Sequence, residues 1–146
     1  MSTVAIRPAG SADLPEVLRL VAQLHPEDRP PDPDRAGRAL AEILSRADHA
    51  LLVAERGGAV TGTLHLVMAP NLTHDGAPWA VVENIVVDEG FRGQGVGRAL
   101  MDEAERRARE AGCYKVQLMS ADERGVGAFY EGLGFELRAR GYRKYF

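Results

Sequence analysis

Three glycines at alternate positions, Gly93, Gly95 and Gly97, mark the part of the sequence best suited to bind a ligand. Glycines leave backbone N–H groups uncovered, and apolar residues at helical spacing follow them, so these groups should lie at the start of a helix. The partial positive charge at that end of a helix favours a phosphate. Arg92 and Arg98 flank the glycines and add charge suited to a pyrophosphate. The pattern predicts a site for a phosphate-bearing ligand.

The spacing of these glycines separates three kinds of phosphate-binding loop. A Walker loop requires a Lys after its last glycine, and none follows here. A dinucleotide-binding fingerprint requires Gly or Ala where this chain has Arg98, although Asp122 would at a stretch supply its ribose-binding acid. The third pattern, Arg/Gln-x-x-Gly-x-Gly/Ala, is matched by Arg92, Gly95 and Gly97 at every fixed position. The dinucleotide interpretation is weakened but stays open, as does a glycine-rich turn that binds no ligand.

Regular elements are expected on both sides of the loop. The run 81–87 is β-branched except at two polar positions, which is typical of a buried strand. The helix after the loop should end near Gly112, which we expect to be its C-cap, and the pattern of 114–119 predicts another strand. This order predicts a parallel crossover, with the reactive site where its two strands approach, near the carboxyl end of the first.

The whole sequence predicts an α/β fold with a mixed, mostly antiparallel sheet flanked by helices, in a single domain over 1–146. Ser11 is expected to cap the first helix. The other expected elements are strands at 3–8, 50–55 and 60–67, a second helix at 35–45, a short helix at 126–132, and closing strands at 135–137 and 142–146.

Composition limits the classes of function. The 45% hydrophobic and 27% charged fractions are ordinary for a globular protein, and a net charge of −3 gives no sign of nucleic-acid binding. No apolar run approaches membrane-spanning length, and the N-terminus lacks a signal-peptide pattern. The single cysteine excludes an internal disulfide and fits the reducing cytoplasm, which is the location we expect.

Over residues 6–146 the chain resembles the GNAT superfamily of N-acetyltransferases, and its motifs are most similar to those of glucosamine-phosphate N-acetyltransferases and bacterial relatives. The matching segments are 83–87 (ENIVV), 92–97 (RGQGVG), 112–116 (GCYKV) and 129–135 (FYEGLGF). The resemblance implies an acyl-CoA N-acyltransferase fold, acetyl-CoA as co-substrate, and a splayed pair of strands that holds the pantetheine arm. The coenzyme site would comprise Ile85, Val86, Val87, Arg92, Gly93, Gln94, Gly95, Val96, Gly97, Arg98 and Tyr130.

Two side chains are candidates for proton transfer. Tyr130 stands where family members place a tyrosine near the coenzyme sulfur, and a phenol can donate to a departing thiolate; the alternative is a core aromatic beside Phe129. Glu83 is a charge within an apolar strand, where burial without a partner is costly. It is a candidate base for the incoming ammonium, directly or through water, or else a carboxylate that faces solvent or pairs with an Arg. Backbone N–H groups at 85–87 are expected to polarise the acetyl carbonyl.

Other polar residues have weaker claims. Ser120 and Arg124 follow the next strand, near the expected thiol or substrate. Cys113 is expected to pack rather than react. The four histidines lack close metal-binding spacing, and His65 is expected on a solvated strand face, with the substrate cleft as the alternative. Acidic residues within 27–34 would attract a cationic amine or simply be solvated.

These features together predict an N-acetyltransferase that joins acetyl-CoA and a small-molecule amine in a ternary complex, by direct attack and without a metal. No covalent acyl acceptor stands out in the sequence, which argues against a ping-pong route. A protein or peptide acceptor, a nucleotide-dependent dehydrogenase and a non-catalytic acyl-CoA sensor stay open, as does a homodimer. The acceptor loops, expected at 26–34 and 70–79, do not identify the amine, and the range of acyl chains is open.

Overall fold

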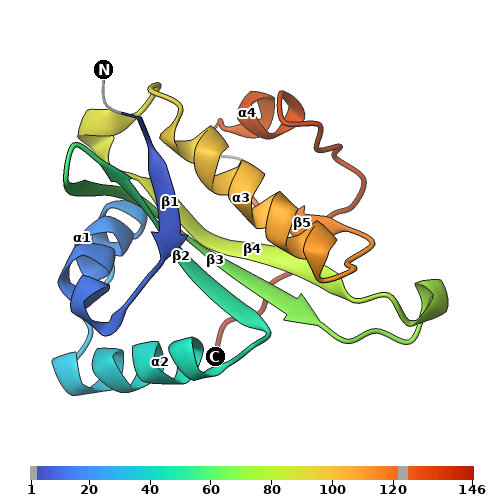
Figure 1. The fold of residues 1–146 in the computed structure, drawn as a ribbon, viewed down its shortest axis with the longest axis horizontal. Coiled ribbons are helices and arrows are strands. Elements are labelled where there is room, and N and C mark those ends of the chain that lie inside the picture. The colour runs from blue at the N-terminus through green and yellow to red at the C-terminus, as the bar shows by residue number, and fades with distance from the viewer. Residues whose placement is uncertain (1–2, 122–124) are drawn as a thin grey trace.

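The computed structural model describes residues 3–121 and 125–146, and it contains a five-stranded sheet in the order β1-β2-β3-β4-β5 (Figure 1). Neighbouring strands are antiparallel from β1 to β4, whereas β4 and β5 are parallel. The predicted mixed, mostly antiparallel sheet is therefore confirmed. The elements are β1 Ala5–Pro8, α1 Leu14–Leu24, α2 Pro33–Ser45, β2 His49–Arg56, β3 Ala59–Ala69, β4 Trp79–Val87, α3 Val96–Glu110, β5 Val116–Leu118 and α4 Gly127–Glu131.

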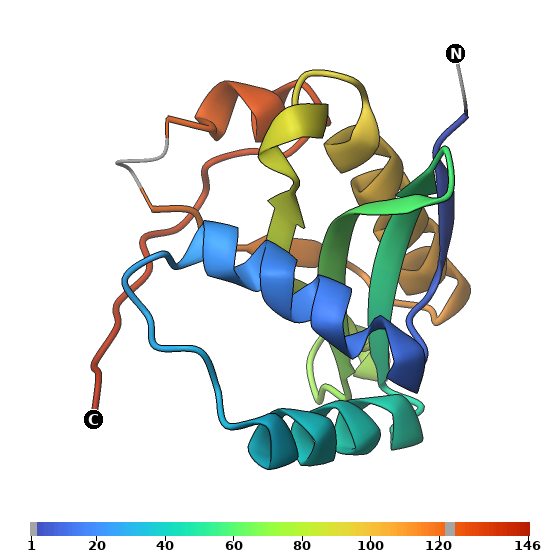
Figure 2. The same ribbon diagram turned by 90° about the vertical axis from the view of Figure 1, so that its left-hand side faces the viewer.

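Helices cover both faces of the sheet (Figure 2). On one face, α3 buries the apolar stripe that the sequence predicts, and α1 and α2 pack on the other. The buried residues of the α3 layer include Val96, Leu100, Ala104 and Ala108 from the helix and Leu52, Leu64 and Leu66 from the sheet. Those of the α1–α2 layer include Val17, Leu40, Leu51 and Val53. The carboxyl end of β4 leads through residues 88–95 into the start of α3.

The starts of α1 and α2 differ from the predicted positions. Ser11 does not cap the first helix, because it begins a 3-10 turn, Ser11–Asp13, and α1 starts after that turn. The second helix starts two residues before the predicted position, since the Asp32 carboxylate accepts a hydrogen bond of 2.9 Å from Arg35 N. Pro33 occupies the first helical turn, where its missing N–H costs nothing.

The predicted closing strands at 135–137 and 142–146 are wrong, because residues 132–146 form no strand. A strand requires a neighbour for its backbone hydrogen bonds, and this segment has none within residues 3–121 and 125–146. The side chains of Leu137 and Tyr142 are each 92% exposed. The C-terminal segment 136–146 thus carries an apolar pattern that the chain itself does not bury.

No helix within the described part of the chain has the length and apolar character needed to cross a bilayer.

Candidate active site

The parallel strands β4 and β5 pair over three residues and then separate. Their register runs from Ala80 opposite Val116 to Val82 opposite Leu118, while β4 continues to Val87. Beyond Val82, the β4 edge that would face β5 has no strand beside it among the described residues. The crossover and its opening lie where the sequence predicts a reactive site. We call this opening the β4–β5 wedge.

A β-bulge distorts β4 at the wedge. Asn84 and Ile85 of β4 together oppose only Leu64 of β3, so the ladder between these strands is interrupted. Asn84 has a φ of 50°, in the left-handed region that asparagine tolerates better than most residues. The sequence interpretation missed this bulge, although an Asn within a β-branched run was a usable signal.

Glu83 lies beside the bulge, and it is exposed rather than buried. Within residues 3–121 and 125–146, no hydrogen bond or ion pair engages its carboxylate, so the predicted alternative of a carboxylate that faces solvent is observed, and an Arg partner is not. The following side chains pack instead: Val86 is buried, and Ile85 and Val87 are half-buried against the α3 layer. The backbone groups of these residues that do not pair with β3 are therefore the parts that remain for a ligand.

The glycine loop ends in an uncapped helix. Gly93 and Gly95 have φ values of 70° and 86°, which glycine adopts without steric cost. Gly95 occupies the N-cap position of α3 and offers no side chain to cap it. The first bond inside the helix runs from Ala99 N to Gly95 O, 3.0 Å, which leaves the N–H groups of the preceding turn without intrahelical partners. The uncapped helix start is compatible with the phosphate site that the sequence predicts, which stays a prediction.

Gly97 serves a different purpose, close packing. A Cβ atom there would lie 3.2 Å from Phe129 Cζ and 3.5 Å from Val87 Cγ2, so α4 rests directly on the first turn of α3. Tyr130 follows on α4, half-buried, with its ring edge-on to Phe129 at 5.1 Å and to Phe135 at 6.1 Å. This contact places the helix that carries Tyr130 beside the glycine loop.

Some polar side chains of the loop make hydrogen bonds within the protein, and one is left for a ligand. Gln94 stabilises the loop, since its Nε2 donates to Gly90 O at 3.1 Å and its Oε1 accepts from Arg56 Nη1 at 2.7 Å. Arg92 Nε donates to the last carbonyl of β4 at 3.3 Å. Arg98 is exposed on the first turn of α3, and nothing else in 3–121 or 125–146 pairs with its guanidinium. Arg98 is therefore the cation most available to a phosphate.

Helix α1 is fastened to the turn that precedes the loop. Arg19 forms an ion pair with the Asp88 carboxylate, and Gln23 Nε2 donates to the same carboxylate at 3.3 Å. Gln23 Oε1 in turn accepts from Glu89 N at 3.0 Å. Hydrogen bonding by Arg19, then by Gly90 N, lowers the pKa of Asp88 and keeps it charged. We call this set of contacts the α1 latch.

The remaining residues that the sequence proposed for the site have weaker support from the structure. Ser120 is exposed beyond the end of β5, and Arg124, like Asp122, lies outside the described residues. Cys113 is half-buried, and burial raises the pKa of its thiol, which disfavours a nucleophilic thiolate. No cluster of metal-ligating side chains occurs among the residues that the structure describes. His65 is half-buried and lines a cavity, so the predicted solvated strand face is wrong.

Comparison with known proteins identifies the family. Residues 14–135 match the Acetyltransferase (GNAT) family. The chain belongs to this family. A glucosamine 6-phosphate N-acetyltransferase of Trypanosoma brucei brucei is 32% identical over 143 residues, which cover 94% of this chain and 92% of the relative. GNAT membership and such named relatives make this protein an acetyl-CoA-dependent N-acetyltransferase.

Solved structures agree with this fold and family. A putative acetyltransferase from Agrobacterium tumefaciens has a TM-score of 0.91 and 36% identity, and the match covers 97% of this chain and 99% of that one. An aminoglycoside N-acetyltransferase in complex with CoA has a TM-score of 0.80 and 27% identity, covering 99% and 96% of the two chains. The GNAT-like fold predicted from the motifs is confirmed.

Proposed function

We propose that this GNAT protein transfers the acetyl group of acetyl-CoA to the primary amine of a small molecule, by direct attack within a ternary complex. The observation that carries the proposal is the β4–β5 wedge beside an uncapped helix start. The wedge offers backbone groups to a narrow, amide-bearing arm, and the helix start offers N–H groups to a pyrophosphate. The named activities of the relatives, which act on amino sugars and aminoglycosides, support an acceptor of this kind.

The coenzyme fits the residues present. The N–H groups of the first turn of α3, with Arg98 and the loop 92–95, would hold its pyrophosphate, and the exposed edge of β4 would pair with its pantetheine amides. Acetyl-CoA supplies the acetyl group as a thioester. Backbone N–H groups at 85–87 stabilise the charge that develops on the carbonyl oxygen.

Two side chains handle protons in this proposal. Glu83 accepts a proton from the acceptor ammonium, directly or through water, which frees the nitrogen lone pair for attack. The new C–N bond forms as the C–S bond breaks, and the Tyr130 phenol donates its proton to the departing sulfur. The proton that leaves the new amide nitrogen, directly or through water, restores the phenol. The position of Glu83 beside the bulge, and the position of Tyr130 on the helix that touches the glycine loop, support these roles.

Thiol release tests the proposal. The protein, acetyl-CoA and a panel of small amines are mixed, and free coenzyme A thiol is measured against reactions that lack amine. We expect release that depends on both protein and amine. Binding of acetyl-CoA without turnover of any amine would instead identify an acyl-CoA sensor, and acetylation confined to peptides would identify a protein acceptor. Binding of a nicotinamide dinucleotide in place of coenzyme A would refute the proposal.

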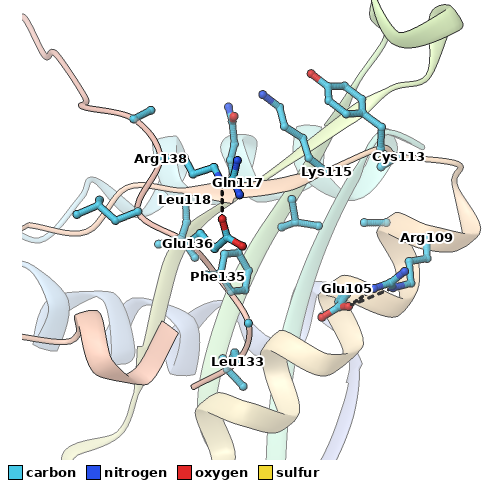
Figure 3. A pocket seen from close by; sticks show the side chains of 16 residues that line it. Glu105, Arg109, Cys113, Lys115, Gln117, Leu118, Leu133, Phe135, Glu136 and Arg138 are labelled. Atoms are coloured by element: carbon cyan, nitrogen blue, oxygen red, sulfur yellow. Dashed lines mark hydrogen bonds and ion pairs between the residues drawn. The ribbon is translucent and has the colours of Figure 1, made fainter. Parts of the chain in front are cut away.

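We also propose that the protein forms a homodimer through the open edge of β5 and the C-terminal segment 136–146. Within the described residues, β5 pairs only with β4, so its other edge presents free backbone groups. A cavity of about 600 Å³ lies between this edge and the segment that follows α4; Figure 3 shows Lys115, Gln117 and Phe135 around it. A second copy supplies both an apolar segment and a strand edge, which makes the contact self-complementary.

Light scattering during gel filtration tests the dimer. A dimer has about twice the mass of the 15.8 kDa chain, and deletion of 140–146 should shift the protein toward monomer while leaving the helical circular dichroism intact. A full-length protein that stays monomeric at all accessible concentrations would contradict the proposal.

A further inference from the structure

A second cavity, of about 260 Å³, lies between the sheet and helices α1 and α2. Its walls are apolar and include Val17 of α1 and Leu40 of α2. The polar residues among those lining it are Thr63, His65 and Asn84. Thr63 Oγ1 donates to the carbonyl of Leu52 at 2.8 Å, so its proton is already used. His65 and Asn84 therefore supply the polar groups of an otherwise apolar cavity.

The position of the cavity suits an acceptor. Asn84 is the bulged residue beside the β4–β5 wedge, so the cavity reaches the same point of β4 that the proposed thioester would occupy. On the opposite face of the sheet, Ile85, Val87 and Tyr130 pack into the α3 layer and fill the space. An amine would thus approach the wedge from the α1–α2 side.

The histidine in this cavity is held by a second histidine. His65 Nε2 lies 2.9 Å from His49 Nδ1, and Asp48 Oδ1 lies 3.9 Å from His49 Nε2. The Asp48 carboxylate favours a proton on His49 Nε2, which makes His49 Nδ1 the acceptor and His65 Nε2 the donor of the bond between the rings. His65 Nδ1 then keeps its lone pair. Burial, and secondarily the charge of His49, lower the pKa of His65 and favour this neutral form.

A carboxylate lies near the same end of the cavity. Glu83 is the cross-strand partner of His65, and side chains of directly opposed residues lie on one face, about 5 Å apart at Cβ. An ammonium group can donate to the lone pair of His65 and to the Asn84 side-chain oxygen while Glu83 balances its charge. The groups that α1 and α2 present to the cavity are apolar, so they add no competing charge.

We propose that this cavity is the acceptor pocket, and that it takes a primary amine on a compact apolar body, with the amino group received by His65 and Asn84. The inference rests on the acetyltransferase function proposed above and names its substrate class. None of the described residues that line the cavity is Lys or Arg, so a phosphate there would lack a cation. The acceptor therefore differs from the sugar phosphate named for the trypanosomal relative. Its body is small, because the cavity is below the usual range of about 300–1,000 Å³ for ligand pockets.

Filling the cavity tests this inference. Ala36 lines it from α2, so Ala36→Leu places three further carbons inside, whereas Ala41 is exposed on the same helix and does not line it, so Ala41→Leu is the matched control. With benzylamine as acceptor and thiol release as the assay, Ala36→Leu should lower kcat/KM by about tenfold or more. Ala41→Leu should retain the wild-type value. The melting-temperature increase caused by acetyl-CoA should be the same in both variants, since the coenzyme binds elsewhere.

The wild-type protein provides the specificity test. Benzylamine should have a kcat/KM at least about tenfold above that of glucosamine 6-phosphate, and His65→Leu should raise KM for benzylamine. Preference for glucosamine 6-phosphate, or equal benzylamine kinetics in Ala36→Leu and Ala41→Leu, would overturn the pocket assignment.

Direct binding separates the two proposals. Benzylamine added without acetyl-CoA should perturb the NMR signals of His65 and of α1 and α2 in the wild type but not in Ala36→Leu. Binding without thiol release would uphold the pocket and refute acetyl transfer to this amine class. Thiol release with other amines, and no benzylamine binding, would refute the pocket and uphold the transferase.

Discussion

Gly95→Ala is the sharpest test of the coenzyme site, because its effects on folding and on binding can be worked out separately. A Cβ atom at Gly95 would meet no other atom within 4 Å, so the substitution costs only the left-handed backbone at φ 86°. That cost is about 1–2 kcal/mol. In a chain of this size 1 kcal/mol corresponds to about 2–4 °C, so the melting temperature should fall by roughly 2–8 °C. Typical domain stabilities of about 5–15 kcal/mol leave the variant folded.

The effect on binding arises from the same methyl group. It would stand in the space from which a pyrophosphate approaches the N–H groups of α3, and we expect acetyl-CoA affinity to fall by about tenfold or more. Thermal denaturation with increasing acetyl-CoA measures this. At 100 times the dissociation constant the ligand stabilises the native state by about 2.7 kcal/mol, and a tenfold weaker complex forfeits about 1.4 kcal/mol of that. The loss is roughly 3–6 °C of the ligand-induced shift.

Gly58→Ala is the matched control. Gly58 has a φ of 81° and equally open surroundings, but it lies in the hairpin between β2 and β3, away from the loop. The Gly58→Ala variant should lose as much stability as Gly95→Ala, and it should keep the full increase in melting temperature that acetyl-CoA causes. Equal shifts in the two variants would refute the assignment of the phosphate site to the glycine loop.

Three further predictions concern protons. Tyr130→Phe should lower kcat by roughly 10- to 1,000-fold with coenzyme affinity retained, and Tyr142→Phe, at an exposed position, should not; full activity would leave Tyr130 a packing residue. Glu83→Gln should lower kcat with little change in KM for acetyl-CoA; a rise in amine KM alone would indicate attraction of the substrate instead. Because burial lowers the pKa of His65 below 6.5, the unfolded chain binds this proton more readily. The free energy of unfolding should decrease from pH 7 to pH 5, less so in His65→Gln; equal pH dependence would contradict the shift.

Local patterns in the sequence predicted the parts of the site that depend on neighbours in the chain. The strand before Asp88, the glycine loop and the apolar stripe of α3 are all contiguous, and each lies where the sequence placed it. The bulge at Asn84 and the contact of His65 with His49 depend on the register between strands, which the sequence of one strand does not specify. The sequence predicted closing strands at 135–137 and 142–146, but a strand also needs a partner strand, and none lies beside these segments in the described part of the chain.

The α1 latch has a consequence for how the two substrates bind. One side of α1 forms a wall of the proposed acceptor cavity, while Arg19 and Gln23 hold the turn that leads into the glycine loop. If the ligands of the two proposed sites order this helix, each reduces the entropy that the other must lose. Thermodynamic reciprocity then requires acetyl-CoA to tighten amine binding by the same factor by which the amine tightens acetyl-CoA binding. The helix α1 would then couple the two sites. The ternary complex with acetyl-CoA and amine would be favoured over the complex with either substrate alone.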